Sequence, residues 1–373
     1  VADWSLFLIF ALVLFQLGVG VLPAWHPDWS PVLTWFVALA AAILFFGSIV
    51  VHELSHAIVG RMNGIPVRRI TLFLFGGMAH MEGEPPSPKS ELLMAGVGPI
   101  VSLAIGVVSI ALGVAISGEA LSMLATDPAG AYAQLGPVAT LLLWLGPVNV
   151  LLGVFNLVPG FPLDGGRVLR ALLWWGTGDL KKATRWASGV GRLFGLTLIA
   201  LGVFAALGGS LLQGVWLVLI GWFLSSAARA GYQQVVVREA LDGVPVALVM
   251  RSRLETVEPM ISVDRLVYDF LMATDQQAFP VLDGGRLVGI ITMQDVRRIP
   301  REEWPVTPVS RIMTPVEQLV TIDAGSPASE ALEKLASRDV DQIPVLEHGA
   351  LRGMVRRQDV MKWIAMNEPG LPA

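Results

Sequence analysis

The chain has no cysteine among its 373 residues, and it has only five histidines. Without cysteine there is no disulfide framework and no thiolate ligand for a metal ion. Any metal site must therefore be built from imidazole and carboxylate groups. The small number of histidines narrows the search for such a site.

Charged residues are also scarce, at 15% of the chain, and they are unevenly distributed. Of the 26 basic and 30 acidic residues, residues 1–230 carry only 21 in total. The mean hydropathy of +0.64 is typical of a membrane protein. We therefore expect a membrane domain at residues 1–230, followed by a soluble domain. The net charge of −4 gives no indication of a nucleic acid partner, and none is expected.

Six apolar runs are long enough to cross a bilayer as helices, which predicts a polytopic α-helical membrane protein. The first run lacks a basic segment before it and an obvious small-residue cleavage site, so we expect it to be retained as a span. In chain order the runs are Ser5–Leu22, Val32–Gly60, Leu92–Ile116, Gly136–Val158, Val190–Leu207 and Leu211–Ala228.

Basic residues occur in alternate connections between these runs. Segments 61–91 and 159–189 contain several lysines and arginines, whereas segments 23–31, 117–135 and 208–210 contain none. Basic connections are usually cytoplasmic, so this alternation places both termini and the soluble domain on the cytoplasmic side.

The second run ends in a cluster of ionisable residues, His52-Glu53-Leu54-Ser55-His56. Such residues are costly within a membrane and are functional by default. His52 and His56 are four residues apart, so on a helix they share one face and form half of a zinc site. Glu53 lies beside them, where it can take a proton from water at the metal. Chance occurrence or two packed, hydrogen-bonded histidines are the alternatives.

A third ligand is expected from the polar segment after the fourth run. Asp164 lies at a depth similar to that of the histidines, and its carboxylate would complete the set for one zinc ion per chain. The surrounding prolines and glycines break the helix, which is tolerated at membrane depth only where the backbone lines a cavity. Two alternatives stay open, namely Asp164 as a helix cap only and His80 as the third ligand.

Segment 65–84, which contains His80, has a strand-like composition that ends in Gly76-Gly77. We interpret it as a β hairpin or a re-entrant element at the border of the site. An exposed edge strand there could hold an extended peptide by main-chain pairing. An ordinary amphipathic connector is the alternative.

Asn156 is predicted to be part of the catalytic site. Its carboxamide could donate a hydrogen bond to a developing oxyanion or to the substrate backbone. Asn149 lies seven residues earlier and is the alternative for this role. Either residue could instead form hydrogen bonds between helices, which is the usual role of a buried asparagine in a membrane.

The soluble part contains an internal repeat. Residues 279–296 match residues 343–360, an offset of 64 residues. Each copy has the pattern of a strand, a glycine turn, a second strand and the start of a helix, which indicates two packed copies of one unit. The first copy ends in Thr292-x-x-Asp295, whereas in the second copy Arg356 replaces the hydroxyl before Asp359.

The motifs of the membrane part resemble those of the site-2 protease family of intramembrane metalloproteases. The motifs that carry this resemblance are His52-Glu53-Leu54-Ser55-His56, Gly98-Pro99, and the segment from Asn156-x-x-Pro159 to Leu163-Asp164-Gly165-Gly166. The resemblance implies that both histidines and Asp164 bind Zn²⁺ and that Glu53 activates water. The implied substrate is a transmembrane protein helix, cut near the cytoplasmic face. The layout looks like the branch that includes the sporulation-factor-processing proteases, which implies a prokaryotic plasma membrane.

The repeat resembles a pair of CBS domains, which bind adenine nucleotides between the two copies. This resemblance implies a C-terminal α/β domain that could form homodimers, with Thr292, Asp295 and Asp359 as candidate nucleotide-binding residues. A module that serves only for dimerisation is the alternative. The predicted domains are a transmembrane metalloprotease domain at 1–230, a linker at 231–243, and CBS repeats at 244–300 and 301–367.

The predicted function is that of a zinc endopeptidase that cleaves transmembrane or membrane-associated proteins and is regulated through its CBS pair. A CBS-regulated ion or metal transporter is the alternative, because ionisable residues within spans can also form an ion path. A transporter would not need Glu53 at this position between two histidines. The expected partners are the protein substrate, membrane lipid and adenine nucleotide.

Overall fold

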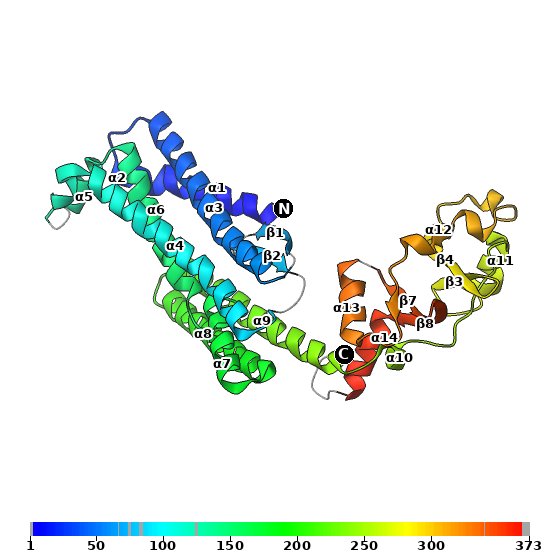
Figure 1. Ribbon diagram of the computed structural model, residues 1–373. Coiled ribbons are helices and arrows are strands. Elements are labelled where there is room, and N and C mark those ends of the chain that lie inside the picture. The colour runs from blue at the N-terminus through cyan, green and yellow to red at the C-terminus, as the bar shows by residue number, and fades with distance from the viewer. Residues whose placement is uncertain are drawn as a thin grey trace. The chain divides into compact units, whose positions relative to one another are not determined.

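The computed structural model describes residues 3–65, 67–73, 76–81, 85–123, 126–338 and 340–367. The chain divides into two compact units, Val1–Tyr232 and Gln233–Ala373. Figure 1 shows that the first unit consists mainly of long helices, whereas the second combines strands with shorter helices.

The first unit contains six helical segments long and apolar enough to cross a membrane among the described residues, as the sequence predicted. The first, Trp4–Trp25, combines α1 (Trp4–Phe15), a π-helical turn (Gln16–Val21) and α2 (Leu22–Trp25). The other five are α3 (Pro31–Met62), α4 (Pro88–Ile116), α6 (Pro137–Asn156), α8 (Leu180–Leu207) and α9 (Leu211–Asp242). Shorter helices are a 3-10 helix (Gly118–Met123), α5 (Pro128–Ala133) and α7 (Asp164–Thr177).

The ends of two of these helices differ from the expected spans. Helix α8 begins at Leu180, ten residues before the apolar run that predicted it. Its first part carries basic residues, which hydropathy alone does not count as part of a span. Helix α9 continues to Asp242, so most of the segment 231–243, expected as a linker, is helical.

Serine-proline pairs define where α3 and α4 begin. The Ser30 side chain accepts a hydrogen bond from the backbone N–H of Leu33, and the Ser87 side chain accepts one from Ser90. Proline suits the first turn that follows, because its missing N–H would have no partner inside the helix there. These caps set the start of the two helices that later carry the site.

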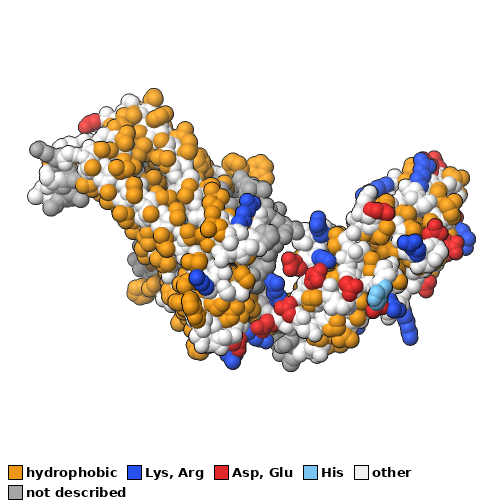
Figure 2. Space-filling view, in the orientation of Figure 1, with side chains coloured by type: hydrophobic (Ala, Val, Ile, Leu, Met, Phe, Trp, Pro, Cys, Tyr) orange, Lys and Arg blue, Asp and Glu red, His pale blue; other side chains and the backbone are white. Residues whose placement is uncertain are grey.

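Small and polar residues make up much of the interior of the first unit. A Cβ atom on Gly106 of α4 would lie 2.9 Å from the carbonyl oxygen of Gly146 in α6. A Cβ atom on Gly153 of α6 would lie 3.0 Å from the carbonyl oxygen of Pro99 in α4. Glycine therefore lets these two backbones approach closely, as is common for helices packed within a membrane. Many large apolar side chains face outward instead, and they cover the face shown in Figure 2.

A two-stranded hairpin follows α3. Strand β1 (Val67–Phe73) pairs antiparallel with β2 (Gly76–Met81), and the register sets Val67 opposite Met81 and Phe73 opposite Gly76. Both strands contact α3. The sequence left a hairpin and a re-entrant element open, and the described backbone is that of a hairpin.

The second unit contains two small sheets, each built around an antiparallel hairpin. In the first sheet β4 lies between β3 and β5, and in the second β7 lies between β6 and β8, with β6 and β7 parallel. The strands are β3 (Ala278–Asp283), β4 (Arg286–Thr292), β5 (Thr314–Pro315), β6 (Ile322–Asp323), β7 (Gln342–Glu347) and β8 (Ala350–Arg356). The helices are α10 (Val246–Val249), α11 (Val263–Arg265), α12 (Met293–Val296), α13 (Ala328–Ser337) and α14 (Arg357–Asn367), with a π-helical turn (Leu266–Leu271) and 3-10 turns at Arg301–Glu303, Val309–Arg311 and Val316–Gln318.

The two hairpins share one turn geometry, which the sequence repeat already suggested. Gly284 and Gly285 join β3 to β4, and His348 and Gly349 join β7 to β8, all four with positive φ. A two-residue turn with positive φ at both positions matches the twist of the strands. Each copy packs on its own apolar core, around Phe279 in the first and Ile343 in the second.

Candidate metal centre

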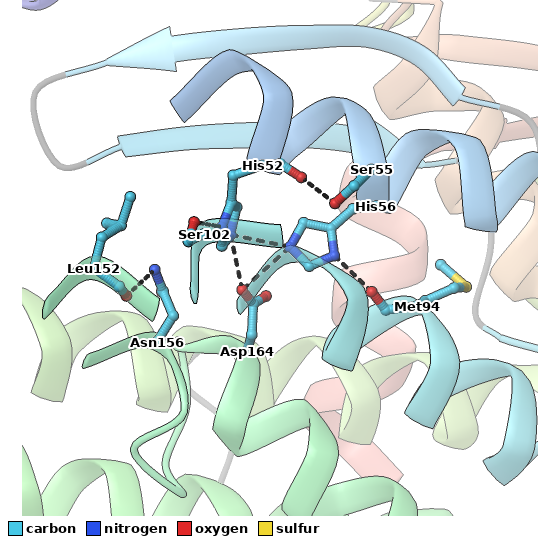
Figure 3. A network of polar contacts seen from close by, with 8 residues as sticks. All are labelled: His52, Ser55, His56, Met94, Ser102, Leu152, Asn156 and Asp164. Carbon is cyan, nitrogen blue, oxygen red and sulfur yellow. Dashed lines mark hydrogen bonds and ion pairs between the residues drawn. The ribbon is translucent and has the colours of Figure 1, made fainter. Parts of the chain in front are cut away.

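His52 and His56 lie on one face of α3, one helical turn apart, as their spacing predicted (Figure 3). Both residues are buried, with 4% of each exposed. Their Nε2 atoms are 3.2 Å apart and point toward the same space. Two ring nitrogens therefore converge on one point deep inside the first unit.

Helix α4 holds the other nitrogen of each ring. The Nδ1 atom of His56 lies 2.6 Å from the carbonyl oxygen of Met94, and Nδ1 of His52 lies 2.9 Å from Oγ of Ser102. A carbonyl oxygen can only accept, so Nδ1 of His56 must carry a proton and donate it. The lone pair of the neutral ring is then on Nε2, the atom that faces the shared space. Such partners fix the orientation of histidines that bind metals.

Asp164 completes the cluster from α7. It is the first residue of that helix, and its Oδ2 atom lies 3.1 Å from Nε2 of both His52 and His56. The capping position is Leu163, and no side-chain capping bond is found there. The Asp164 carboxylate thus faces the imidazoles, and the structure brings the three predicted ligands together (Figure 3).

The negative charge of the Asp164 carboxylate is suited to binding a metal cation. Its Oδ2 atom faces the Nε2 atoms of both imidazole rings, where a negative charge would favour a bound cation. Glu53 is partly buried and lies within electrostatic range of this cluster and of Arg167 on α7. A carboxylate oxygen therefore stands beside two imidazole nitrogens, with a second carboxylate nearby.

These three donor atoms fit a zinc ion in kind and spacing. Ligands about 2.0–2.1 Å from a tetrahedral zinc lie about 3.3 Å from one another. The separations here are 3.1, 3.1 and 3.2 Å. The neighbouring backbone also leaves room, because a Cβ atom on Gly98 of α4 would lie 2.2 Å from Nε2 of His56 and 2.7 Å from Nε2 of His52. Any side chain at Gly98 would fill the space that the three donors face.

The two asparagines of α6 are not part of this cluster. Asn156, the last residue of α6, donates from Nδ2 to the carbonyl oxygen of Leu152, 3.1 Å away in its own helix (Figure 3). Asn149 is fully buried and donates in the same way to Leu145, at 3.0 Å. Local bonds of this kind leave the catalytic role of Asn156 as a prediction.

His80 lies in β2, with its backbone opposite Arg69 of β1. Its side chain lies outside the part of the chain that the structure describes. The alternative of His80 as the third ligand therefore stays a prediction.

The candidate nucleotide-binding residues of the two repeats have different partners. In the first repeat Oδ2 of Asp295 accepts hydrogen bonds from Oγ1 and N–H of Thr292, at 2.7 and 2.9 Å. In the second repeat the two carboxylate oxygens of Asp359 accept a fork of bonds from Arg356, at 2.8 and 2.9 Å, and Arg251 adds a contact of 3.3 Å. The second carboxylate is thus occupied by two arginines.

Three features of the centre were not singled out from the sequence. They are the Ser102 hydroxyl, the Met94 carbonyl and the buried ion pair of Glu91 with Arg170. A serine in an apolar run and a charge at its start were the only signals available. Neither reveals a partner that lies many residues away in the chain.

Comparison with known proteins bears on both units. Residues 40–198 match Peptidase family M50, and residues 246–302 and 309–366 each match the CBS domain. Rip3 of Mycobacterium tuberculosis is 33% identical over 97% of this chain and 89% of its own. The protein sll0528 of Synechocystis is 31% identical over 96% of this chain and 90% of its own. Zinc metalloprotease MJ0392 of Methanocaldococcus jannaschii is 28% identical over 87% of this chain and 85% of its own.

The similarity to these relatives covers the membrane helices, the histidine and aspartate cluster and the CBS pair alike. The family match runs from within α3 to within α8 and includes every residue of the cluster. The chain therefore belongs to peptidase family M50, and it is an integral membrane zinc metalloprotease of the site-2 protease type with a C-terminal pair of CBS domains.

Proposed function

We propose that this protease cleaves transmembrane or membrane-associated protein substrates near the cytoplasmic face. The carrying observation is the cluster of His52, His56 and Asp164 near the end of α3, which is 32 residues long and is followed by a basic connection. That connection and the next basic one indicate the cytoplasmic side for this end of the helix. We place both termini and the CBS pair on that side of a prokaryotic plasma membrane.

Zinc bound by His52, His56 and Asp164 would polarise the scissile carbonyl and make water more acidic. Glu53 is the general base in this proposal. It takes a proton from water as the new C–O bond forms, and it returns that proton to the amide nitrogen as the C–N bond breaks. Asn156 would donate to the developing oxyanion with the second N–H of its carboxamide, because the Leu152 carbonyl oxygen accepts only one.

The substrate must be extended where it is cut, because a helix keeps its carbonyl groups in hydrogen bonds. The β1–β2 hairpin supports a way to hold such a segment. It is a sheet of two strands next to α3, so a further strand could pair along an edge. Membrane lipid would surround the remaining spans.

The CBS pair is proposed to bind an adenine nucleotide and to support homodimers. Thr292 and Asp295 are the proposed ribose site, because the first repeat keeps the hydroxyl that Arg356 replaces in the second, where this arginine binds Asp359. The nucleotide alters cleavage only if it binds two arrangements of the protein with different affinity. A six-span unit followed by a CBS pair suits the branch of sporulation-factor-processing proteases.

The deciding experiment is cleavage of a single-span substrate with helix-breaking residues near its cytoplasmic end. Wild type and Glu53→Gln are reconstituted separately with this substrate in vesicles, and the fragments are quantified. Glu53→Gln should abolish cleavage, because Gln cannot accept the proton of water. Asp28→Asn, which alters an exposed carboxylate, is the control and should cleave like wild type. Equal cleavage by wild type and Glu53→Gln would contradict the proposal.

A further inference from the structure

A buried ion pair joins α4 to α7 beside the metal centre. Glu91 in the first turn of α4 has none of its surface exposed, and Arg170 of α7 has 5% exposed. Nε of Arg170 lies 2.6 Å from Oε1 of Glu91, and the Nη2 atom contacts the same oxygen. Arg167, one turn earlier on α7, lies 3.9 Å from that oxygen.

Burying such an ion pair is energetically unfavourable, and a gain in stability alone does not explain why the pair is present. Taking both charges out of water is energetically unfavourable, and apolar residues of similar size often stabilise a protein as well or better. An arginine differs from an apolar side chain because its planar guanidinium group forms directional hydrogen bonds and so sets the geometry of a carboxylate contact. The pair therefore suits a role in which the relative position of two helices matters.

Both helices hold parts of the metal centre. On α4, Glu91 is followed one turn later by Met94, whose carbonyl oxygen accepts from His56, and two turns later by Gly98, which leaves space for the centre. On α7, Asp164 is the first residue and Arg170 lies in the second turn. The contacts form a closed ring that runs from His56 to α4, across the ion pair to α7, and through Asp164 back to His56.

Arg170 also holds the segment that precedes Asp164. Its guanidinium carbon lies 5.3 Å from the centre of the Phe161 ring, in a cation–π arrangement. Phe161 lies in the loop between α6 and α7, three residues before Asp164. Arg170, six residues after the proposed ligand, thus contacts a residue three positions before it.

We infer that the Glu91–Arg170 pair is a positioning element for the metal centre, one that sets where Asp164 stands relative to His52 and His56. This inference rests on the proposed zinc site. The pair touches neither substrate nor metal. Its effect is to hold the third ligand at the distance at which zinc is bound tightly.

The test separates positioning from folding by removing both charges together. Arg170→Met alone leaves the Glu91 carboxylate buried without this partner and should unfold at lower temperature. The double variant Glu91→Met/Arg170→Met buries no charge at the pair. In the absence of zinc it should therefore recover much of the stability that Arg170→Met loses. Thermal unfolding of zinc-free full-length protein in detergent measures this effect, and competition with a metal chelator measures zinc affinity in the same samples.

The double variant should bind zinc at least about tenfold more weakly than wild type, as expected when partners behind metal ligands are lost. Arg170→Lys keeps the charge but loses the planar contact, so it should fold and also bind zinc more weakly. Arg185→Met, at an exposed arginine of α8, is the control and should match wild type in both measurements.

The measurement of zinc affinity in wild type distinguishes two outcomes. Failure of wild type to bind zinc would contradict the metal centre itself. Normal binding by wild type together with equal affinity in Arg170→Lys and in the double variant would leave the centre intact and overturn the positioning role. If the double variant does not fold, Arg170→Lys alone decides the question.

Discussion

The two units of this chain differ in the charged and polar residues that they bury. The first unit encloses His52, His56, Glu91 and Arg170 among the described residues and turns large apolar side chains outward. The second unit packs apolar side chains inward, and Asp295 is its only buried charged residue among those described. In water the hydrophobic effect fills a core, whereas in lipid it does not distinguish the inside from the outside. The buried charged groups of the first unit therefore gather around the metal centre, whereas Asp295 of the second unit bonds to Thr292 at the start of α12.

The largest effect on zinc binding is expected at Gly98 of the first unit, where the absence of a side chain leaves space beside the histidines. Gly98→Ala would place a Cβ atom 2.2 Å from Nε2 of His56, so we expect zinc affinity to fall by about 100-fold or more. Gly96→Ala on the same helix is the control, because a Cβ atom there meets nothing within 4 Å. Chelator competition on both variants measures the difference. Equal zinc affinity in the two variants would show that Gly98 does not border the site.

Truncating a side chain in the apolar core of the second unit should lower the stability of that unit and leave zinc binding unchanged. Leu335→Ala removes a fully buried side chain from the core of the second repeat and should cost about 2–5 kcal/mol of unfolding free energy. Leu248→Ala, at a residue that is 68% exposed, should change stability by less than about 0.5 kcal/mol. Denaturant unfolding of the full chain, followed together with zinc content, checks both. Loss of zinc in Leu335→Ala at low denaturant would show that the two units are not independent.

The two repeats should differ as nucleotide sites. Asp295→Ala should weaken ATP or AMP binding about tenfold, or ~1.4 kcal/mol, whereas Asp359→Ala should change it by less than about threefold. The reason is that Asp359 is already held by Arg356 and Arg251. Calorimetry on the full-length protein measures both affinities. A larger loss in Asp359→Ala would reverse the assignment of the ribose site.

The smallest effect concerns the pH dependence of the second unit. Burial raises the pKa of Asp359, but the hydrogen bonds and charges of Arg356 and Arg251 outweigh it, so this pKa lies below its unfolded value. The contacts of Asp359 with the two arginines therefore contribute stability above the unfolded pKa near 3.9, and this contribution is lost as the pH falls through the folded pKa. Asp359→Asn should remove that part of the acid sensitivity. Thermal unfolding between about pH 3 and pH 7 tests it, and identical pH profiles for Asp359→Asn and wild type would contradict it.

Much of this arrangement is local in the sequence and was predictable from it. Spans follow from apolar runs, and the four-residue spacing of His52 and His56 fixes their common face. The depth of Asp164 followed from topology. The partners of these residues were not predictable, because the contacts of Ser102 and of Glu91 with Arg170 depend on how α3, α4 and α7 pack. The length of helix α9 was underestimated, because its polar C-terminal end lacks the hydropathy of a span.

The most direct test of the central claim is the zinc content of purified wild type, Glu53→Gln and Asp164→Ala, measured by elemental analysis. The proposed ligand set predicts about one zinc per chain in wild type and in Glu53→Gln, and little or none in Asp164→Ala. Loss in Asp164→Ala alone would separate the ligand from the base in one experiment. Full zinc retention in Asp164→Ala, or no zinc in wild type, would contradict the claim that His52, His56 and Asp164 form the metal centre.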